Sequence, residues 1–206
     1  MKEKVLVIGA ARSGIAVSRL LNQRGYNVIL TDAKEIKEKT ELSNIGIQVV
    51  DNGHPEWLKN TDYAFVVKNP GIPYHVEIVK FFIDHKVPVY TEIEIGYKMA
   101  PEYTFAAVTG TDGKTTVTTL LYEMLNKKSE ALVAGNIGIP LSEQVLKSDG
   151  TPKDVAIELS NFQLLGTETF RPHVSTVTNL APDHLDYMDS LESYYVSKMK
   201  IYANET

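Results

Sequence analysis

The 206-residue sequence contains no cysteine, which excludes disulfide bonds and thiolate metal sites. It has no apolar run near the ~20 residues of a membrane span. The apolar run near the N-terminus is only about six residues long, too short for the core of a signal peptide. Excess basic charge is also absent, because 21 Lys and Arg oppose 26 Asp and Glu for a net charge of −5. We therefore expect a soluble cytoplasmic protein with no nucleic-acid and no membrane partner.

The composition is that of a globular protein, with 43% hydrophobic and 23% charged residues. Residues 5–8 form a continuous apolar run before Gly9, which is typical of a strand buried on both faces. Apolar residues then recur at helical spacing up to Leu21, and Gly25 follows as a helix stop signal. Strand-like runs at 45–50, 63–67 and 88–90 and a helical stretch at 75–84 continue the alternation. This pattern predicts an open parallel α/β sheet.

The alternation breaks near residues 92–104, around Pro101, and a second α/β unit follows. We predict a Rossmann-like domain over 1–93 and an incomplete P-loop-type α/β domain over 94–206. The second domain has strand-like runs at 104–110, 130–136, 154–160 and 174–180, and helical segments at 115–128 and 189–205. Asp189 and Glu192 resemble a capping box at the start of the last helix. No strand closes the second sheet, so we expect the chain to be a piece of a longer protein.

The first glycine loop, Gly9 to Gly14, resembles the dinucleotide pattern G-x-G-x-x-G, with Ala11 in place of the middle glycine. Asp32 ends a strand-like run at 27–32, the second predicted strand, where a ribose-binding carboxylate belongs. One interpretation is a diphosphate at the helix N-terminus with a ribose near Asp32. The other is a tight turn between strand and helix that binds no ligand.

The second glycine loop predicts a phosphate site, because a strand precedes it and a helix follows it. Its residues are Gly110, Thr111, Asp112, Gly113, Lys114, Thr115 and Thr116. Lys114 is placed to neutralise β- and γ-phosphate charge, and the Thr115 hydroxyl to bind Mg²⁺. Asp112 would repel phosphate, so we expect its side chain to face outward and only its N–H to serve the ligand. The alternative is a glycine turn with an ordinary surface lysine.

Three further features lie downstream of this loop. Glu158 ends an apolar strand, where its carboxylate could hold Mg²⁺ or lie exposed. Asp183, His184 and Asp186 follow the next strand and could bind metal or phosphate, or be structural. From composition, Lys198 on the last helix is a solvated lysine.

Five segments in this order resemble the Mur ligases of peptidoglycan synthesis: VVKNPGIP, GTDGKTT, AGNIG, ELSNFQL and TNLAPDHLDYM. The resemblance covers essentially the whole chain and is greatest to the member that adds D-glutamate. It implies an ATP-dependent ligase whose small-molecule substrates are UDP-N-acetylmuramoyl-L-alanine, D-glutamate and ATP. It further implies an acyl-phosphate intermediate and a monomeric protein. The family's C-terminal domain is absent, so we expect this chain alone to be inactive.

The resemblance also implies roles for individual residues. Lys114, His184 and Lys198 would be catalytic, and residues 110–116 would bind ATP. Two Mg²⁺ ions would be held by Thr115, Glu158, His184 and Lys198, with Lys198 carbamylated. The UDP-sugar would contact Arg12, Ser13, Asp32, Ala33, Lys34, Gly71, Asn136, Ser160 and Gln163. Asp112 and Asn161 stand where the family has asparagine and serine.

Two other functions remain open at this stage. A related ligase with another acceptor or amino acid would share the GTDGKTT loop and the histidine segment. A non-catalytic UDP-sugar or nucleotide-binding module would keep the binding loops and lack turnover. Substrate profiling separates the first of these from the D-glutamate ligase, and binding without turnover identifies the second.

Overall fold

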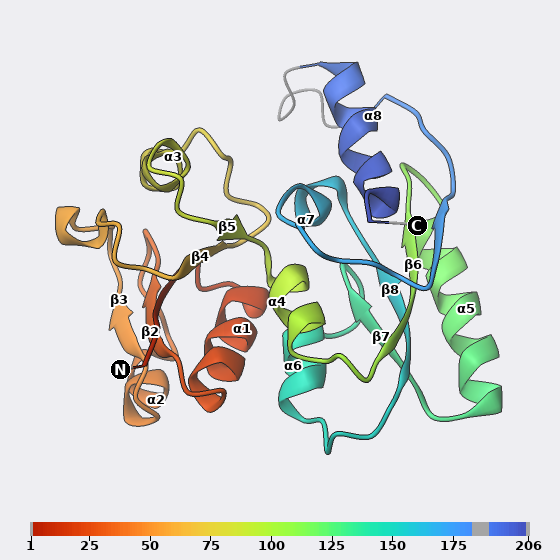
Figure 1. Cartoon of the computed structure of the whole chain (residues 1–206), viewed down its shortest axis with the longest axis horizontal. Coiled ribbons are helices and arrows are strands. Elements are labelled where there is room, and N and C mark those ends of the chain that lie inside the picture. Colours follow the sequence, from red (N-terminus) through yellow and green to blue (C-terminus); the bar gives the residue numbers. More distant parts are fainter. Residues whose placement is uncertain (1, 183–189, 205–206) are drawn as a thin grey trace.

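Two parallel α/β units lie side by side in the computed structural model, which describes residues 2–182 and 190–204 (Figure 1). The first unit contains β1 (Lys4–Ile8), α1 (Arg12–Gln23), β2 (Asn27–Thr31), α2 (Lys39–Asn44), β3 (Gln48–Val50), η1 (Glu56–Leu58), β4 (Phe65–Lys68), α3 (Glu77–Asp84) and β5 (Val89–Tyr90). The helix α4 (Glu92–Lys98) connects it to the second unit. The second unit contains β6 (Thr104–Thr109), α5 (Lys114–Lys128), β7 (Ala131–Gly135), α6 (Leu141–Leu146), β8 (Asp154–Glu158), α7 (Asn161–Leu165), β9 (Val174–Val177), α8 (Leu191–Met199) and η2 (Lys200–Tyr202).

The first sheet has the strand order β3-β2-β1-β4-β5, and all its pairings are parallel. Helices cover the strands, so β1 is apolar along most of its length and Val5 to Ile8 are fully buried. The chain turns in opposite directions after β1 and after β4, and ligands bind at such switch points in open α/β sheets. The predicted Rossmann-like sheet is confirmed, and its crevice lies at Gly9 and Asn69.

The second sheet has the order β7-β8-β6-β9 and is also fully parallel. In its register Val108 lies beside Glu158, and Thr109 lies beside Val177. The carboxyl end of β6, which leads into the glycine loop, therefore lies between the carboxyl ends of β8 and β9. This arrangement confirms the predicted α/β class and gathers three predicted site segments at one edge.

The helix α4 occupies the first part of the segment 92–104, where the sequence shows a break in the alternation and predicts no helix. It lies with α1 and α6 between the two sheets (Figure 1). Its Ile93 packs into the core of the second unit and its Ile95 into that of the first. An element with apolar residues toward both sides has no single amphipathic stripe, which is why its periodicity was not recognised. The predicted domain boundary falls inside this helix and stays a prediction.

The helix α8 lies within the predicted helical segment 189–205, and its N-cap is one residue later than the predicted cap. Ser190 is its N-cap, and its hydroxyl accepts the backbone N–H of Ser193 at 3.0 Å. The Ser193 hydroxyl accepts the N–H of Ser190 in return, also at 3.0 Å. Serine is a strong N-cap residue, so this pair fixes the helix start in place of Asp189 and Glu192.

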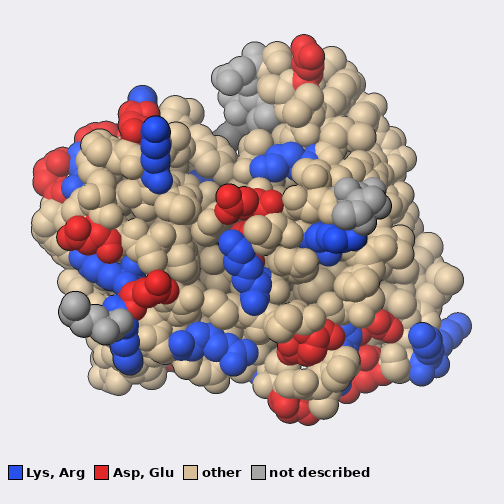
Figure 2. Space-filling view, in the orientation of Figure 1, with Lys and Arg blue, Asp and Glu red and all other residues tan. Residues whose placement is uncertain are grey.

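Charged side chains of both signs are interspersed on the face shown in Figure 2, where basic residues form no continuous patch. Within the part of the chain that the structure describes, no helix is long and apolar enough to cross a membrane.

Glu92 gives the fold a predicted pH dependence. Its carboxylate is buried beneath α6 and accepts the backbone N–H of Ser142, and burial raises the pKa of Glu92 to about 7. The folded protein thus binds this proton more tightly than the unfolded chain, so the free energy of unfolding should fall as pH rises from about 4.5 through about 7. The shift corresponds to about 3 kcal/mol. Glu92→Gln should flatten this decline and raise the melting temperature at pH 8, but not at pH 4.

Denaturant unfolding of both proteins across pH 4–9 measures the effect. A suitable control is Glu143→Gln. Glu143 lies on α6, the helix above Glu92, but forms an ion pair with Lys147 near the surface. A wild-type curve that is flat between pH 4.5 and 7 would contradict the assignment.

Candidate functional site

The glycine loop after β6 has a backbone that only glycine allows at two positions. Gly110 has φ of +141°, and a Cβ there would lie 2.0 Å from the Thr178 hydroxyl oxygen. Gly113 has φ of +77° and is the N-cap of α5. The loop consequently presents backbone N–H groups at the start of a 15-residue helix, an arrangement that favours phosphate.

Lys114 is the first residue of α5, and its side chain folds back over the loop. Its Nζ donates to the backbone oxygen of Thr111 at 2.7 Å, and the side chain is half-buried. The ammonium group is therefore held over the loop, and its predicted role in neutralising phosphate charge stays a prediction.

Thr115, Glu158 and Asn136 form a hydrogen-bonded group beside the loop. The Thr115 hydroxyl donates to one oxygen of the Glu158 carboxylate, and the Asn136 side-chain amide donates to the other, both at 2.8 Å. Glu158 is only 1% exposed, so these contacts compensate for burial of its charge. A hydroxyl and a carboxylate are the oxygen donors that suit Mg²⁺, so Thr115 and Glu158 fit one such ion. The described residues contain no cluster of three or more acidic or histidine side chains suited to a metal.

The segment after β9 holds the glycine loop in place. The Asn179 side chain accepts the backbone N–H of Asp112 and donates to its carbonyl oxygen, both at 3.0 Å. The Thr178 hydroxyl donates to that oxygen at 2.6 Å, and the Thr111 N–H donates to the Asn179 carbonyl at 3.1 Å. The Asp112 side chain is exposed as predicted, but its N–H is bound to Asn179, which corrects the expectation that this N–H is free for a ligand.

Sequence reasoning assigned no role to Asn179. The available signal was its position, because a polar residue at the carboxyl end of a parallel strand faces the ligand crevice. Its contribution could be seen only when β9 was placed next to β6.

Loss of the Asn179 side chain should weaken nucleotide binding. Asn179→Ala removes two hydrogen bonds that hold Asp112, so we expect roughly tenfold weaker binding of ATP to the complete gene product, measured by calorimetry. Asn204→Ala is the matched control, because Asn204 also donates to two backbone oxygens but lies on the segment after η2. Equal ATP affinity in the Asn179 variant and the wild type would show that the loop does not need this support.

Lys198 is buried, which corrects the compositional interpretation of a solvated lysine. It is 2% exposed, and its Nζ donates to the Gly110 carbonyl oxygen at 2.7 Å. The same Nζ lies 4.6 Å from the centre of the Tyr194 ring. Lys198 therefore lies beside the glycine loop after β6, 84 positions further along the chain than Lys114, and the role implied by the family resemblance stays a prediction. Asp183, His184 and Asp186 lie outside the described residues.

The first glycine loop is a close-packed junction. A Cβ on Gly14 would lie 1.8 Å from the Gly9 carbonyl oxygen, so glycine lets α1 pack against the end of β1. The Asp32 carboxylate accepts the backbone N–H of Ala10 at 2.7 Å and that of Lys34 at 2.9 Å. Asp32 thus braces the loop in this structure. The predicted UDP-sugar contacts of Asp32, Ala33 and Lys34 stay predictions.

A cleft of about 280 Å³ lies between the two units and gathers four predicted UDP-sugar residues: Arg12, Ser13, Asn136 and Gln163. Arg12 donates to the Gly138 carbonyl oxygen at 3.0 Å across this boundary. Asn69 donates to the Ser13 hydroxyl and accepts the backbone N–H of Gly71, each at 3.1 Å. Asp32, Ala33, Lys34, Gly71 and Ser160 do not line the cleft.

Ser160 does not line the cleft itself but is hydrogen-bonded to Gln163, which does. Its hydroxyl accepts the backbone N–H of Gln163, whose side chain accepts the N–H of Ser160, so the pair forms a capping box at the start of α7. Asn161, which differs from the family pattern, is buried as the first residue of that helix.

Comparison with known proteins supplies relatives for both units. Residues 108–206 match the family described as "Mur ligase middle domain". The chain is 44% identical over 204 residues to the UDP-N-acetylmuramoylalanine–D-glutamate ligase of Streptococcus agalactiae serotype III (strain NEM316). This match covers 97% of the chain and 45% of that ligase. It is 40% identical to the ligase of the same name from Listeria monocytogenes serotype 4b (strain F2365), covering 99% and 46%. The chain thus spans about half the length of these relatives.

Solved structures with the same fold are more distant in sequence. The UDP-N-acetylmuramate:L-alanyl-gamma-D-glutamyl-meso-diaminopimelate ligase of Neisseria meningitides is 19% identical, with a TM-score of 0.62 over 99% of this chain and 68% of that one. The UDP-N-acetylmuramate-alanine ligase MurC of Thermotoga maritima is 23% identical, with a TM-score of 0.58 over 99% and 47%. At this identity the likeness establishes the fold alone.

Proposed function

We propose that this chain belongs to the Mur ligase family and is the acceptor- and phosphate-binding part of an ATP-dependent ligase. The reaction joins D-glutamate to UDP-N-acetylmuramoyl-L-alanine in peptidoglycan synthesis. The relatives at 40–44% identity carry the name of this activity. We place the protein in the cytoplasm as a monomer, on the sequence interpretation.

One observation supports this proposal most directly: Asn136 belongs to both candidate sites. It lines the cleft between the units, and its amide donates to the same Glu158 carboxylate that accepts the Thr115 hydroxyl. Two hydrogen bonds thus connect the phosphate loop to the cleft that gathers the predicted UDP-sugar residues. A ligase needs this proximity, because the acceptor's carboxylate must meet the γ-phosphate of ATP.

The chemistry follows from the weakness of a free carboxylate as an acyl donor. Attack of the acceptor carboxylate on the γ-phosphorus would give an acyl phosphate and ADP. Attack of the D-glutamate amine on the acyl carbon would then form the amide and release phosphate. Lys114 and the loop N–H groups would neutralise charge on the transferring phosphoryl group. Asn136, Ser160 and Gln163 would orient the acceptor near Glu158.

Two Mg²⁺ ions would supply further neutralisation of phosphate charge. Thr115 and Glu158 would hold one of them, and His184 with Lys198 would help to hold the second. Lys198 would act as a carbamate, formed when its neutral amine adds CO₂ and releases a proton. In that form its two oxygens would supply anionic ligands for Mg²⁺.

The test uses the complete gene product with ATP, UDP-N-acetylmuramoyl-L-alanine and D-glutamate. Release of ADP and phosphate should require all three substrates, and the product should gain one glutamate residue by mass spectrometry. Turnover with another amino acid in place of D-glutamate would indicate a related ligase. Binding of the nucleotide sugar with no turnover would indicate a binding module. For the isolated 206-residue chain we expect binding without turnover.

A further inference from the structure

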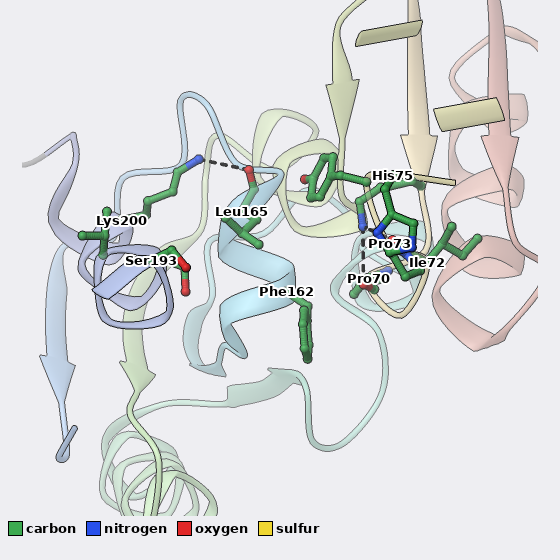
Figure 3. Close-up of a pocket in the computed structure, with 12 residues that line it drawn as sticks. Pro70, Ile72, Pro73, His75, Phe162, Leu165, Ser193 and Lys200 are labelled. Carbon is green, nitrogen blue, oxygen red and sulfur yellow. Dashed lines mark hydrogen bonds between the residues drawn. The ribbon is translucent and has the colours of Figure 1, made fainter. Parts of the chain in front are cut away.

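A second cavity lies between the loop after β4 and the helices α7 and α8, and no predicted site residue lines it (Figure 3). Its volume is about 440 Å³, within the range of small-molecule sites. One wall consists of Pro70, Ile72 and Pro73, and Phe162 on α7 lies opposite (Figure 3). The cavity therefore offers an apolar surface on both sides, contributed by both units.

The charged residues that line this cavity are the lysines Lys68 and Lys200. No carboxylate lines it among the described residues. The Lys200 Nζ donates to the carbonyl oxygens of Leu165 and Thr167, each at 3.0 Å, which leaves a third hydrogen for a ligand. Burial lowers the pKa of Lys200, so its ammonium group would gain from an anionic partner. The local charge favours an anion.

A hydroxyl group at the same cavity has no hydrogen-bond partner among the described residues. The Tyr74 Oη atom is buried, and the Tyr74 ring lies 4.4 Å from the Lys68 Nζ. Burial raises the pKa of Tyr74 to about 12, so its hydroxyl keeps its proton and can donate it. Buried polar groups in proteins are nearly always hydrogen-bonded, so the Tyr74 hydroxyl would gain from an acceptor on a ligand.

We propose that this cavity binds a small organic carboxylate with an apolar body, such as an aryl- or branched alkyl-carboxylate. The carboxylate would face Lys200, an acceptor oxygen would take a hydrogen bond from the Tyr74 hydroxyl, and the apolar body would lie between Pro70 and Phe162 (Figure 3). Pro70 lines both this cavity and the 280 Å³ cleft. A ligand here would tie the loop after β4 to α7 and α8, and so favour one arrangement of the cleft.

The experiment uses the purified chain and 3-phenylpropionate as the probe, with 3-phenylpropanol as the uncharged analogue. Amide shifts in ¹H–¹⁵N spectra report binding. We expect the carboxylate to perturb residues 70–75 and 162–165, and the alcohol to bind about tenfold more weakly. Tyr74→Phe should weaken binding of the carboxylate severalfold without lowering the melting temperature, since the lost hydroxyl has no partner among the described residues. Lys200→Met should abolish binding.

Lys147→Met is the matched control, because Lys147 is an exposed lysine paired with Glu143 at the far side of α6. It should leave binding unchanged. Equal binding of acid and alcohol would overturn the proposal, and so would undiminished binding of the acid to the Tyr74→Phe variant. The absence of amide shifts with 3-phenylpropionate at about 50–100 times the protein concentration would also overturn it. The binding measured with Tyr74→Phe tests the proposal even if Lys200→Met fails to fold. None of these measurements depends on ligase activity.

Discussion

Lys114→Ala is expected to reduce ligation by the complete gene product about 10³-fold, with the loss almost entirely in turnover. The Lys114 ammonium is the cation that the structure holds over the glycine loop, 2.7 Å from the Thr111 carbonyl oxygen. Its charge matters most in the transition state, when negative charge shifts between the transferring phosphoryl group and ADP. ADP release, measured with saturating substrates, quantifies the loss.

The matched control is Lys127→Ala, on the last turn of the same helix, where the side chain is exposed. This variant removes the same charge at the opposite end of α5 and should keep near-normal turnover. The fold should tolerate Lys114→Ala, because the lost hydrogen bond contributes only about 1 kcal/mol. Similar rates for both lysine variants would rule out Lys114 as the phosphate-neutralising group.

Lys198→Ala should also abolish ligation, and small carboxylates such as formate or acetate should restore part of it. The side chain is 2% exposed and reaches the Gly110 oxygen from α8, so its removal leaves a space beside the phosphate loop. If the working form is a carbamate, a carboxylate entering that space replaces the lost anionic oxygens. Activity should therefore rise with carboxylate concentration and saturate.

Rescue separates this role from a purely structural one. A lysine that only holds the Gly110 carbonyl as a cation could not be replaced by an anion, so activity would stay absent at every carboxylate concentration. The same salts should leave the wild-type rate unchanged, and chloride at equal ionic strength should rescue nothing. The melting temperature of the variant shows whether the space also destabilises the fold.

Much of this architecture follows from local sequence patterns. Buried strands such as β1 and β8 are continuous apolar runs that end in a glycine or a carboxylate, so their type and approximate ends could be predicted. The helix α4 could not, because its two apolar sides face two different cores. The start of α8 was displaced by one position, since two neighbouring residues could each cap it and backbone geometry selected Ser190.

The candidate site likewise contains residues that local sequence located and residues that only the fold brought to it. Lys114 and Thr115 are placed by their own loop, so local sequence located them. The environment of Lys198 could not be predicted, because α8 reaches the phosphate loop only through the fold of the second unit. The same holds for Asn179, which supports the loop from the neighbouring strand.

The sequence by itself determined the parallel α/β class, the glycine loop after β6 and the carboxylate at the end of β8, because each depends on residues close together in the chain. Only the tertiary structure decided that Asn136 joins that carboxylate to the cleft, that Lys198 is buried against Gly110, and that Asp32 braces the first loop. These features depend on contacts between residues 22 to 88 positions apart. Such contacts form only when the strands are aligned in a sheet and their carboxyl ends meet at one edge.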